Sequence, residues 1–435
     1  MTHKYLMKTA LAVTLGFAVS ETAFTQDTAT AFTGATLYPI SGAPIENGTM
    51  VVHKGKIIAV GADVSIPDGA VLIDASGMVI MPGLVDTHSH IALTGDGHAA
   101  KKLNPEMRIS DAVWPADPRI KVARTGGVTT ANIMPGSGNI IGGQTAYVKL
   151  RGDTIEEMLV PGSIGGMKMA NGTNPKGKNP ATRMGTAAQA RQAYLKAQDF
   201  VKKRDEAAAN KDDKKKDGRD KKPSSPKRDL ANEALAEILD GKRIVHHHTH
   251  RADDIMTVLR LQKEFGFRVV LQHGTEAFLV ADEIAKRNIP VSAILVDSPG
   301  GKHETMAMTI KSVGILEKAG VKIAFHTDDG ITESRFLLRQ AALGVRGGMS
   351  REGALKAVTQ NPADMLDLGD RLGSLDVGKD ADFILLNGDP FSTYTHVTQT
   401  WIDGIKYFDR NNGKDRLYQT GGWRVADRYP SAGDE

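Results

Sequence analysis

The sequence predicts an α/β fold: a (β/α)8, or TIM, barrel with a small β-sandwich formed by the N- and C-terminal segments. Short β-branched runs separated by Gly, Asn-Gly and Pro-Asp-Gly turns occur near both ends of the chain, at 33–83 and 373–408. Between them, apolar strand candidates alternate with stretches of helical periodicity. We therefore expect the sandwich to combine residues 27–81 and 371–435, with a metal-dependent hydrolase barrel at 82–370 between its two parts.

The barrel strands are expected in apolar segments that recur along the middle of the chain. There are eight of them, at 78–88, 128–134, 144–150, 163–169, 243–248, 268–273, 290–295 and 321–327. Helical periodicity lies between several of these segments, as at 251–266, 277–288 and 305–320, and each of these stretches closes on Gly or Asn. Eight strands with intervening helices fit a closed barrel better than an open sheet.

The first 26 residues are typical of a secretory signal peptide. Lys4 and Lys8 precede an apolar stretch from Thr9 to Val19, which is followed by small and polar residues. This apolar stretch is too short to remain as a membrane-spanning helix, and no later run is long and uncharged enough. We expect an exported protein, periplasmic or secreted after cleavage of the signal peptide, without stable membrane insertion.

Composition limits the chemistry and the partners. The absence of cysteine excludes disulfides, thiolate ligands and a cysteine nucleophile. The net charge of +4 has a local source, because residues 201–229 contain 12 Lys or Arg and 7 Asp or Glu, which is a net +5. This segment is predicted to be a charged insertion, either a solvated helical extension or a flexible stretch. It lacks interleaved aromatic residues, so we expect no nucleic-acid partner.

Ligand-type residues stand at the ends of the predicted strands, where barrel enzymes place their chemistry. His88 and His90 end the first strand, Lys168 lies near the end of the fourth, His248 and His273 end the fifth and sixth, and Asp328 follows the eighth. In His88-Ser-His90, strand alternation sends both imidazoles the same way, so both can reach one cation. Packing alone does not explain apolar strands that repeatedly finish on such residues.

The chain resembles the amidohydrolase superfamily, in particular exported proteins related to imidazolonepropionase and prolidase. The matching segments cover nearly all of the expected mature chain except the charged insertion. They are GLVDTHSH (83–90), GGVTTANIMPGSGNIIGGQ (126–144), GMKMANGTNPKG (166–177), HHHTHRADDI (246–255), LQHGTEA (271–277), the HTDD ending at 329, and NPADMLDLGDRLGSLDVGKDADFILLNGDP (361–390).

The resemblance implies a metal centre at the mouth of the barrel. Its ligands would be His88, His90, Lys168, His248, His273 and Asp328, with Lys168 carrying a carbamate derived from carbon dioxide. A carbamate is an anionic bridge between two divalent ions, here two zinc ions per chain, whereas an unmodified ammonium is a poor neighbour for two cations. Without carboxylation, the His and Asp ligands would still hold one metal.

The expected activity is hydrolysis of a C–N amide bond in a small molecule: a cyclic amide, a small peptide or an N-acyl amino acid. The enzyme class is that of hydrolases of carbon–nitrogen bonds other than peptide bonds, of the amidohydrolase type. Metal-activated hydroxide would attack, and Asp328 would act as the general base. The alternatives are a mononuclear aminohydrolase or deaminase, and a non-catalytic periplasmic metal-binding protein. The sequence leaves a homo-oligomer open.

Four further residues near strand ends are candidates for substrate binding: Gln144, Asn171, His250 and Arg251. Asn174 and His326 are weaker candidates of the same kind. In His246-His247-His248-Thr249-His250, alternation separates His247 from the other three histidines, and the family match selects His248 as the ligand. His246 is then expected deep in the barrel and His247 towards the helical layer, both without a functional role.

Overall fold

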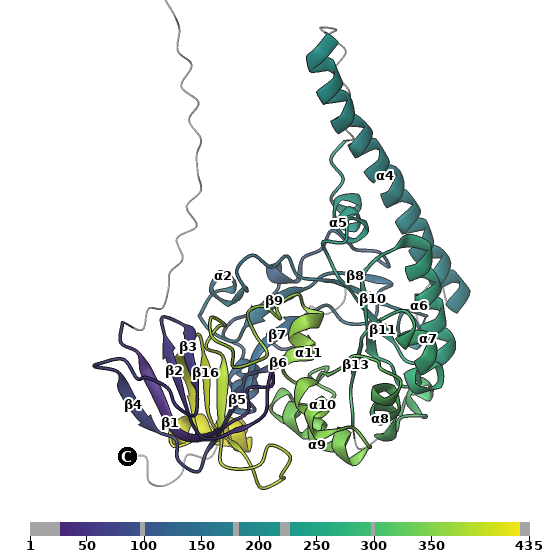
Figure 1. The fold of residues 1–435 in the computed structure, drawn as a ribbon. Helices are drawn as coiled ribbons and strands as arrows, with labels where there is room; N and C mark the ends of the chain where they lie inside the picture. Colours follow the sequence, from purple (N-terminus) through teal and green to yellow (C-terminus); the bar gives the residue numbers. More distant parts are fainter. Residues whose placement is uncertain (1–26, 96–100, 177–181, 218–226, 297–300, 427–435) are drawn as a thin grey trace, which may run out of the picture.

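The fold is described from a computed structural model of residues 27–95, 101–176, 182–217, 227–296 and 301–426, without side chains for 210–217. The predicted signal peptide at 1–26 lies outside the described residues. Three sheets run through this part of the chain, with most of the helices in the central part. Figure 1 shows the N-terminal strands (purple) beside the C-terminal strands (yellow) at one end of the molecule. The central strands and helices, in teal and green, form the other end.

The two ends of the chain meet in one sheet, hereafter the terminal sheet. Its order is β17-β16-β15-β5-β1-β2-β3, and β4 also pairs with β1. The strands are β1 (Thr30–Leu37), β2 (Ile45–His53), β3 (Lys56–Gly61), β4 (Val71–Asp74), β5 (Val79–Pro82), β15 (Phe383–Leu386), β16 (Val397–Ile402) and β17 (Ile405–Asp409). Antiparallel pairing of β5 with β15 joins segments about 300 residues apart. The ends therefore share a sheet, as expected, although a two-layered sandwich stays a prediction.

The terminal sheet has its own aromatic core. Phe32, Phe383 and Trp401 are buried, with Phe32 edge-on to both other rings at centroid separations of 5.0 and 5.1 Å. Phe383 and Trp401 stack at 5.6 Å. Because these rings come from the first, fifteenth and sixteenth strands, burying them holds the two ends of the chain together.

The central strands form two sheets. The order β14-β13-β12-β11-β10-β8 makes the larger sheet and β6-β7-β9 the smaller. The strands are β6 (Leu84–Ser89), β7 (Val128–Ile133), β8 (Ile141–Gln144), β9 (Ala146–Lys149), β10 (Met167–Ala170), β11 (Val245–Thr249), β12 (Val269–His273), β13 (Val291–Ala293) and β14 (Ile323–Phe325). Pairing from β10 through β14 is parallel, as predicted.

Two features of the central strands differ from the sequence prediction. The first strand candidate, 78–88, divides at Gly83 into β5 of the terminal sheet and β6 of the smaller central sheet. A Cβ at Gly83 would lie 2.3 Å from the Thr129 side chain, so only glycine allows the chain to pass this close. The third candidate, 144–150, contains β9, which pairs antiparallel with β7, and only the last residue of β8, a strand that the sequence did not predict and that pairs antiparallel with β10.

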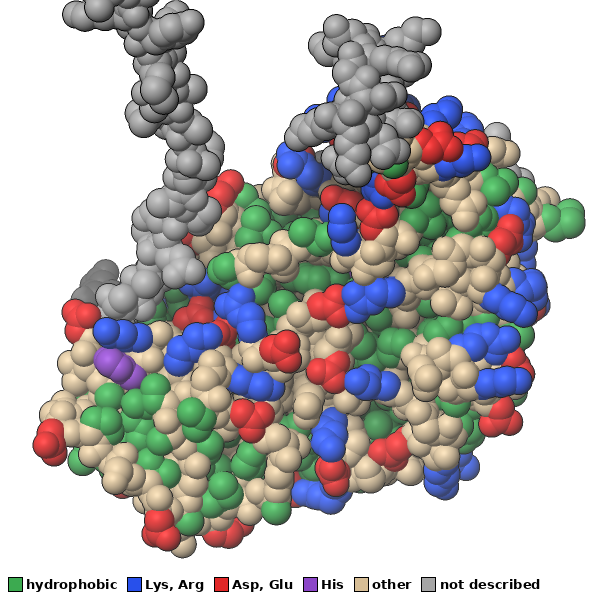
Figure 2. Space-filling model, turned by 45° about the horizontal axis from the view of Figure 1, so that its top comes forward, with side chains coloured by type: hydrophobic (Ala, Val, Ile, Leu, Met, Phe, Trp, Pro, Cys, Tyr) green, Lys and Arg blue, Asp and Glu red, His purple; other side chains and the backbone are tan. Residues whose placement is uncertain are grey.

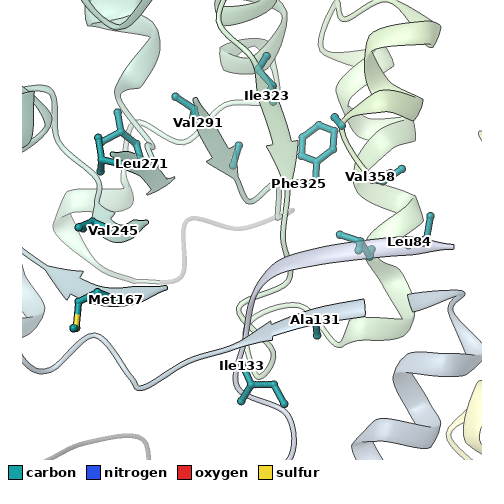
Figure 3. Packing of buried hydrophobic residues seen from close by; sticks show 14 of the residues in the cluster. Leu84, Ala131, Ile133, Met167, Val245, Leu271, Val291, Ile323, Phe325 and Val358 are labelled. Carbon is teal, nitrogen blue, oxygen red and sulfur yellow. The ribbon is translucent and has the colours of Figure 1, made fainter. Parts of the chain in front are cut away.

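Closure into a barrel is not shown by strand pairing, since no paired strands join the two central sheets among the described residues. Single contacts do cross between them: the Asp328 amide donates to the His88 carbonyl at 2.9 Å, and β14 contacts β6. Apolar side chains from the strands of both sheets lie in one core cluster (Figure 3). They include Leu84, Ala131, Ile133, Met167, Val245, Leu271, Val291, Ile323 and Phe325. The structure therefore shows a mixed α/β fold, and the closed (β/α)8 barrel stays a prediction.

Helices follow most of the central strands. They are α1 (Pro118–Thr125), α2 (Ile155–Met158), α3 (Thr173–Lys176), α4 (Arg183–Asp217), α5 (Leu230–Leu239), α6 (Ala252–Phe265), α7 (Ala281–Ala285), α8 (Lys311–Lys318), α9 (Leu337–Arg346), α10 (Arg351–Lys356) and α11 (Gln360–Met365). Helices α12 (Gly413–Thr420) and α13 (Trp423–Ala426) follow the terminal sheet. The predicted C-terminal signals are confirmed at Gly266, Asn288 and Gly320, which all have positive φ. None of the helices in the described part of the chain could span a bilayer.

Helix α4 has two parts with different surroundings. Its first turns pack on α6, where Tyr194 is fully buried between Phe265 and Phe267 at 5.0 and 5.1 Å. The later turns project from the body (Figure 1). There Arg204 forms an ion pair with Asp240 at 2.9 Å. Two alternatives were predicted for the charged insertion, and as far as Asp217 it is the helical extension.

A buried ion cluster joins the smaller central sheet to the terminal sheet. The Lys149 side chain at the end of β9 is fully buried, and its Nζ contacts carboxylates of Asp380 at 2.8 Å, Asp382 at 3.1 Å and Asp403. Burial opposes the charge on Lys149, but the three carboxylates outweigh it and hold the pKa above its usual value. Lys56 reaches Asp380 from the outside at 2.5 Å, with 47% of its side chain exposed.

We expect Lys149→Met to lower the free energy of unfolding by about 3–5 kcal/mol, because the buried carboxylate of Asp382 would lose its cation and those of Asp380 and Asp403 would lose their only fully buried one among the described residues. The control is Lys56→Met, which removes an exposed partner of the same Asp380 and should cost less than about 1 kcal/mol. Denaturant titration followed by circular dichroism measures both variants. Equal losses in the two variants would contradict the importance of the buried lysine.

Candidate metal centre

A cavity of about 910 Å³ lies at the carboxyl ends of the central strands. Four of the predicted ligands line it: His90, His248, His273 and Asp328. The other two, His88 and Lys168, have no exposed surface. Strands β6, β10, β11, β12 and β14 deliver these residues, since parallel strands bring their carboxyl ends to one edge.

Side-chain donors converge in three groups, each with its ligand atoms within 4.8 Å of one another. The first group is His88, His90 and Asp328, and the second is His248, His250 and His273. The third, His88, His273 and His326, connects the other two. Imidazole nitrogens with a carboxylate are the donors that zinc and related divalent ions take in proteins.

The contact between His90 and Asp328 fits a cation in particular. His90 Nδ1 lies 2.8 Å from the Met134 carbonyl oxygen, which can only accept a hydrogen bond, so Nδ1 carries the proton. The other nitrogen, Nε2, then presents a lone pair in the neutral ring, and it faces Asp328 Oδ1 at 3.0 Å. Two acceptors that face each other require a positive charge between them. A histidine that binds a metal through one ring nitrogen usually donates the N–H of the other nitrogen to a group such as this carbonyl.

His88 and Lys168 lie beneath this contact. Lys168 Nζ is 2.9 Å from His88 Nε2 and 3.1 Å from Met134 Sδ. Burial lowers the pKa of Lys168 to about 7, although Asp328 acts in the opposite direction. His88 Nε2 also lies 3.3 Å from Asp328 Oδ1. Burial, reinforced by Lys168, holds the pKa of His88 well below its usual range. The His88 ring is thus a neutral candidate metal ligand beside the Lys168 amine.

The second group has ring nitrogens with no protein partner. His273 Nε2 and His250 Nε2 are buried and accept or donate no hydrogen bond among the described residues. On the opposite side of its ring, His250 Nδ1 contacts Thr275 Oγ1 at 2.8 Å. Burial lowers the pKa of His250 to about 4 and holds that of His273 well below its usual range. An unpaired buried nitrogen is costly, and a metal ion would remove that cost.

His326 belongs to a buried chain of hydrogen-bonding groups that the sequence did not indicate. Thr87 Oγ1 contacts Ser292 Oγ at 2.6 Å, and Ser292 Oγ contacts His326 Nδ1 at 2.8 Å. His326 Nε2 in turn lies 3.2 Å from His273 Nδ1. His326 does not line the cavity. In the sequence, His326 is indicated by its place two residues before Asp328, since alternate strand residues share a face.

Asp86 is a residue of the site that the sequence did not indicate. Fully buried in the middle of β6, it accepts hydrogen bonds from the His88 amide at 3.1 Å and from Thr327 Oγ1 and N at 2.5 and 3.2 Å. Burial raises its pKa to about 7, against these hydrogen bonds. Asp86 therefore ties the strand that carries His88 to the segment that carries Asp328. A carboxylate within an apolar strand was the available signal.

The backbone is strained at two predicted ligands. His273 has φ 71° and Asp328 has φ 47°, in the left-handed region that non-glycine residues seldom adopt. Both residues come at or just after the end of a strand, where the turn directs the side chain to the cavity. Burial raises the pKa of Asp328, whereas the groups beside it, His90 and Lys168 among them, lower it, and the net effect brings this pKa to about 2. Asp328 is thus an anion held in a strained position.

The substrate-binding candidates separate into two groups. His250 lines the cavity, as does Asn174. Gln144, Asn171 and Arg251 do not: Gln144 donates to the Pro105 carbonyl at 3.0 Å, and Asn171 donates to the Asp254 carbonyl at 3.0 Å. Arg251 pairs with Asp253 at 2.9 Å. The cavity therefore gives no support to a binding role for these three residues, because strand-end position does not determine which way a loop side chain turns.

The two histidines without a role lie where alternation placed them. His246 is fully buried among the strands, with Tyr147 Oη at 3.0 Å and Gln272 Nε2 at 3.1 Å. His247 lies on the opposite side of β11, near Arg183 of α4 and Leu261 of α6. Neither lines the large cavity.

Comparison with known proteins gives matches both by sequence and by structure. A sequence model described as "Amidohydrolase family" matches residues 79–407. The solved structure of an amidohydrolase from Thermotoga maritima MSB8 is 36% identical and has a TM-score of 0.79. The alignment covers 87% of this chain and 100% of that one.

Two curated relatives differ in their described activities. The amidohydrolase tasK of Hapsidospora irregularis is 31% identical over 83% of this chain, but the chain spans only 40% of the length of that relative. A 5-methylthioadenosine/S-adenosylhomocysteine deaminase of Symbiobacterium thermophilum is 24% identical, over 83% of this chain and 86% of the relative.

We expect His90→Ala to weaken binding of a divalent ion at least about tenfold, because the ring nitrogen facing Asp328 would be lost. His90 is partly exposed in the cavity, so the fold should tolerate the change. Equilibrium dialysis against zinc, with the metal content determined by mass spectrometry, measures the effect. His53→Ala, in the terminal sheet, is the control, and unchanged zinc binding in both variants would contradict the assignment.

Proposed function

The chain belongs to the amidohydrolase family, whose members hydrolyse C–N bonds, and from this we propose a metal-dependent hydrolase of a small-molecule amide. The substrate class is a cyclic amide, a small peptide or an N-acyl amino acid. The observation that supports it most is Asp328, an anionic carboxylate in the cavity opposite the lone pair of His90. A cavity of about 910 Å³ suits a small-molecule substrate.

The donor groups support two ion positions, and Lys168 lies beside His88 of the first. One position would use His88, His90 and Asp328, and the other His248 and His273, for which His250 offers a further nitrogen. Bound there, divalent ions, zinc in our proposal, lower the pKa of a water molecule and polarise a carbonyl oxygen.

Lys168 is proposed to carry a carbamate derived from carbon dioxide. Its Nζ lies 2.9 Å from His88 Nε2, where an ammonium would add a positive charge among the ligands. The carbamate would be negative and would offer two oxygens. A fully loaded protein that holds one metal per chain would contradict the two-ion proposal and favour the mononuclear alternative.

Asp328 is proposed as the general base. With one Oδ near both His88 and His90, it is within reach of a water placed among the donors. It would accept a proton as the water oxygen bonds to the carbonyl carbon, and then give this proton to the leaving nitrogen as the C–N bond breaks. The products are a carboxylic acid and an amine.

A deaminase is the second candidate, favoured by the deaminase relative that aligns over most of its length. The same residues would activate water, whose oxygen would bond to a ring carbon, and ammonia would leave as the bond from that carbon to its amino group breaks. A non-catalytic metal-binding protein is the third candidate, and it needs no base at position 328. Ammonia release distinguishes the second candidate from the first.

The chain is further proposed to be exported, to the periplasm or the medium, with the signal peptide removed near residue 26. The support is the order of charged, apolar and polar residues at 1–26. Mass spectrometry of the N-terminus of the native protein tests it, and an intact Met1 would contradict cleavage.

We expect Asp328→Asn to lower turnover by about a hundredfold or more, because the amide cannot take up the proton. Turnover is measured with the metal-loaded enzyme on a panel of N-acyl amino acids, Xaa-Pro dipeptides, lactones and imidazolones. Asp370→Asn, the same chemical change at an exposed position, is the control. Undiminished turnover in Asp328→Asn, or no turnover of any compound by the wild-type enzyme, would count against the proposal.

A further inference from the structure

A second cavity, of about 290 Å³, lies outside the metal centre. Its walls come from the end of α1, the segment 335–342 at the start of α9, the loop between β15 and β16, and α12. Phe336 and Arg339 line this cavity and also the large one. The two cavities are thus neighbours that share one wall, and the second contains none of the predicted metal ligands.

Charged groups of one sign line the second cavity. They are Arg335, Arg339 and Arg410, and no Asp or Glu is among the lining residues. Hydroxyl groups of Ser392, Thr393 and Thr395 lie on the loop opposite. The molecular face seen in Figure 2 mixes basic and acidic side chains, so a concave site whose charged lining residues are all basic differs from that surface. Such a site focuses a positive potential.

Two of the arginines have different surroundings. Arg335 pairs with Glu333 at 2.6 Å and donates to the Gln419 carbonyl at 2.5 Å, so it serves to fix the wall. Arg410 donates to the Gln419 side-chain oxygen and has no carboxylate partner among the described residues. Its guanidinium is therefore a charge without a protein counter-ion at the edge of the cavity.

The charge of Arg410 affects the neighbouring imidazole of His396, which also lines the cavity. Burial and then the positive charge of Arg410 lower the pKa of the His396 imidazole. A guanidinium offers several N–H groups in a plane, a geometry that matches carboxylate and phosphate oxygens. The neighbouring hydroxyl groups can also donate to such oxygens.

We propose that the second cavity is a binding site for a small anion that carries a carboxylate or a phosphate group, with Arg410 as its principal cation. The volume of 290 Å³ admits a molecule of that size but not a large polyanion. The site does not depend on the metal centre or on the hydrolase activity, because the residues that distinguish it line only the second cavity.

Isothermal titration calorimetry of the full chain with inorganic phosphate and with succinate tests the proposal. Succinate and phosphate separate the two sources of anionic oxygen, and binding of either supports the site. We expect Arg410→Gln to weaken binding roughly tenfold or more, since a charge-assisted hydrogen bond is lost. Failure of both probes to bind the wild-type chain would overturn the proposal.

Thr393 offers a matched pair of variants that keeps the test independent of the fold around Arg410. Its side chain is exposed on the cavity wall, so substitution should leave the structure intact. Thr393→Glu would add a competing carboxylate and should abolish binding, whereas Thr393→Gln, of similar size, should retain it. An anion held at the metal centre would bind Thr393→Glu unchanged, and that result, or equal loss in both variants, would overturn the proposal.

Discussion

The structure of the candidate centre depends on the burial of uncharged imidazoles around one carboxylate. Desolvation holds the pKa of His88, His248 and His273 well below the usual range, so their rings stay neutral. A neutral ring has one lone pair to offer, and two of these nitrogens, His88 Nδ1 and His273 Nε2, have no hydrogen-bond partner among the described residues. The negative charge of Asp328 then makes the cluster a receptor for cations, which no apolar core of similar volume could be.

Holding such a cluster requires a rigid frame. Asp86 bridges β6 to the segment that ends at Asp328, and Ser292 fixes the ring of His326 against His273. These contacts offset the strained φ of His273 and Asp328. Farther away, Lys149 and its three carboxylates fasten the terminal sheet to the smaller central sheet. Precision at the cavity is therefore maintained by buried polar contacts rather than by packing alone.

The sequence predicted what depends on local pattern. Strand ends located the candidate ligands that meet at the cavity, and alternation separated His247 from His248, because both follow from the period of a β-strand. The division of 78–88 at Gly83 was not predictable, since it results from close approach to Thr129, which is distant in the sequence. Gln144 and Asn171 were placed correctly near strand ends, but their side chains satisfy backbone carbonyls away from the cavity. Contacts between residues that are distant in the sequence leave no periodic pattern from which they could be predicted.

The large cavity is lined by residues other than the candidate ligands as well. Strand-end histidines line it, and so do Phe336 and Arg339. These two side chains also line the second cavity, where the Phe336 ring lies 4.8 Å from the Arg335 guanidinium. A substrate at the metal centre and an anion beside Arg410 would thus contact opposite sides of one wall. Variation in this short segment can alter both sites while the ligand-bearing strands remain unchanged.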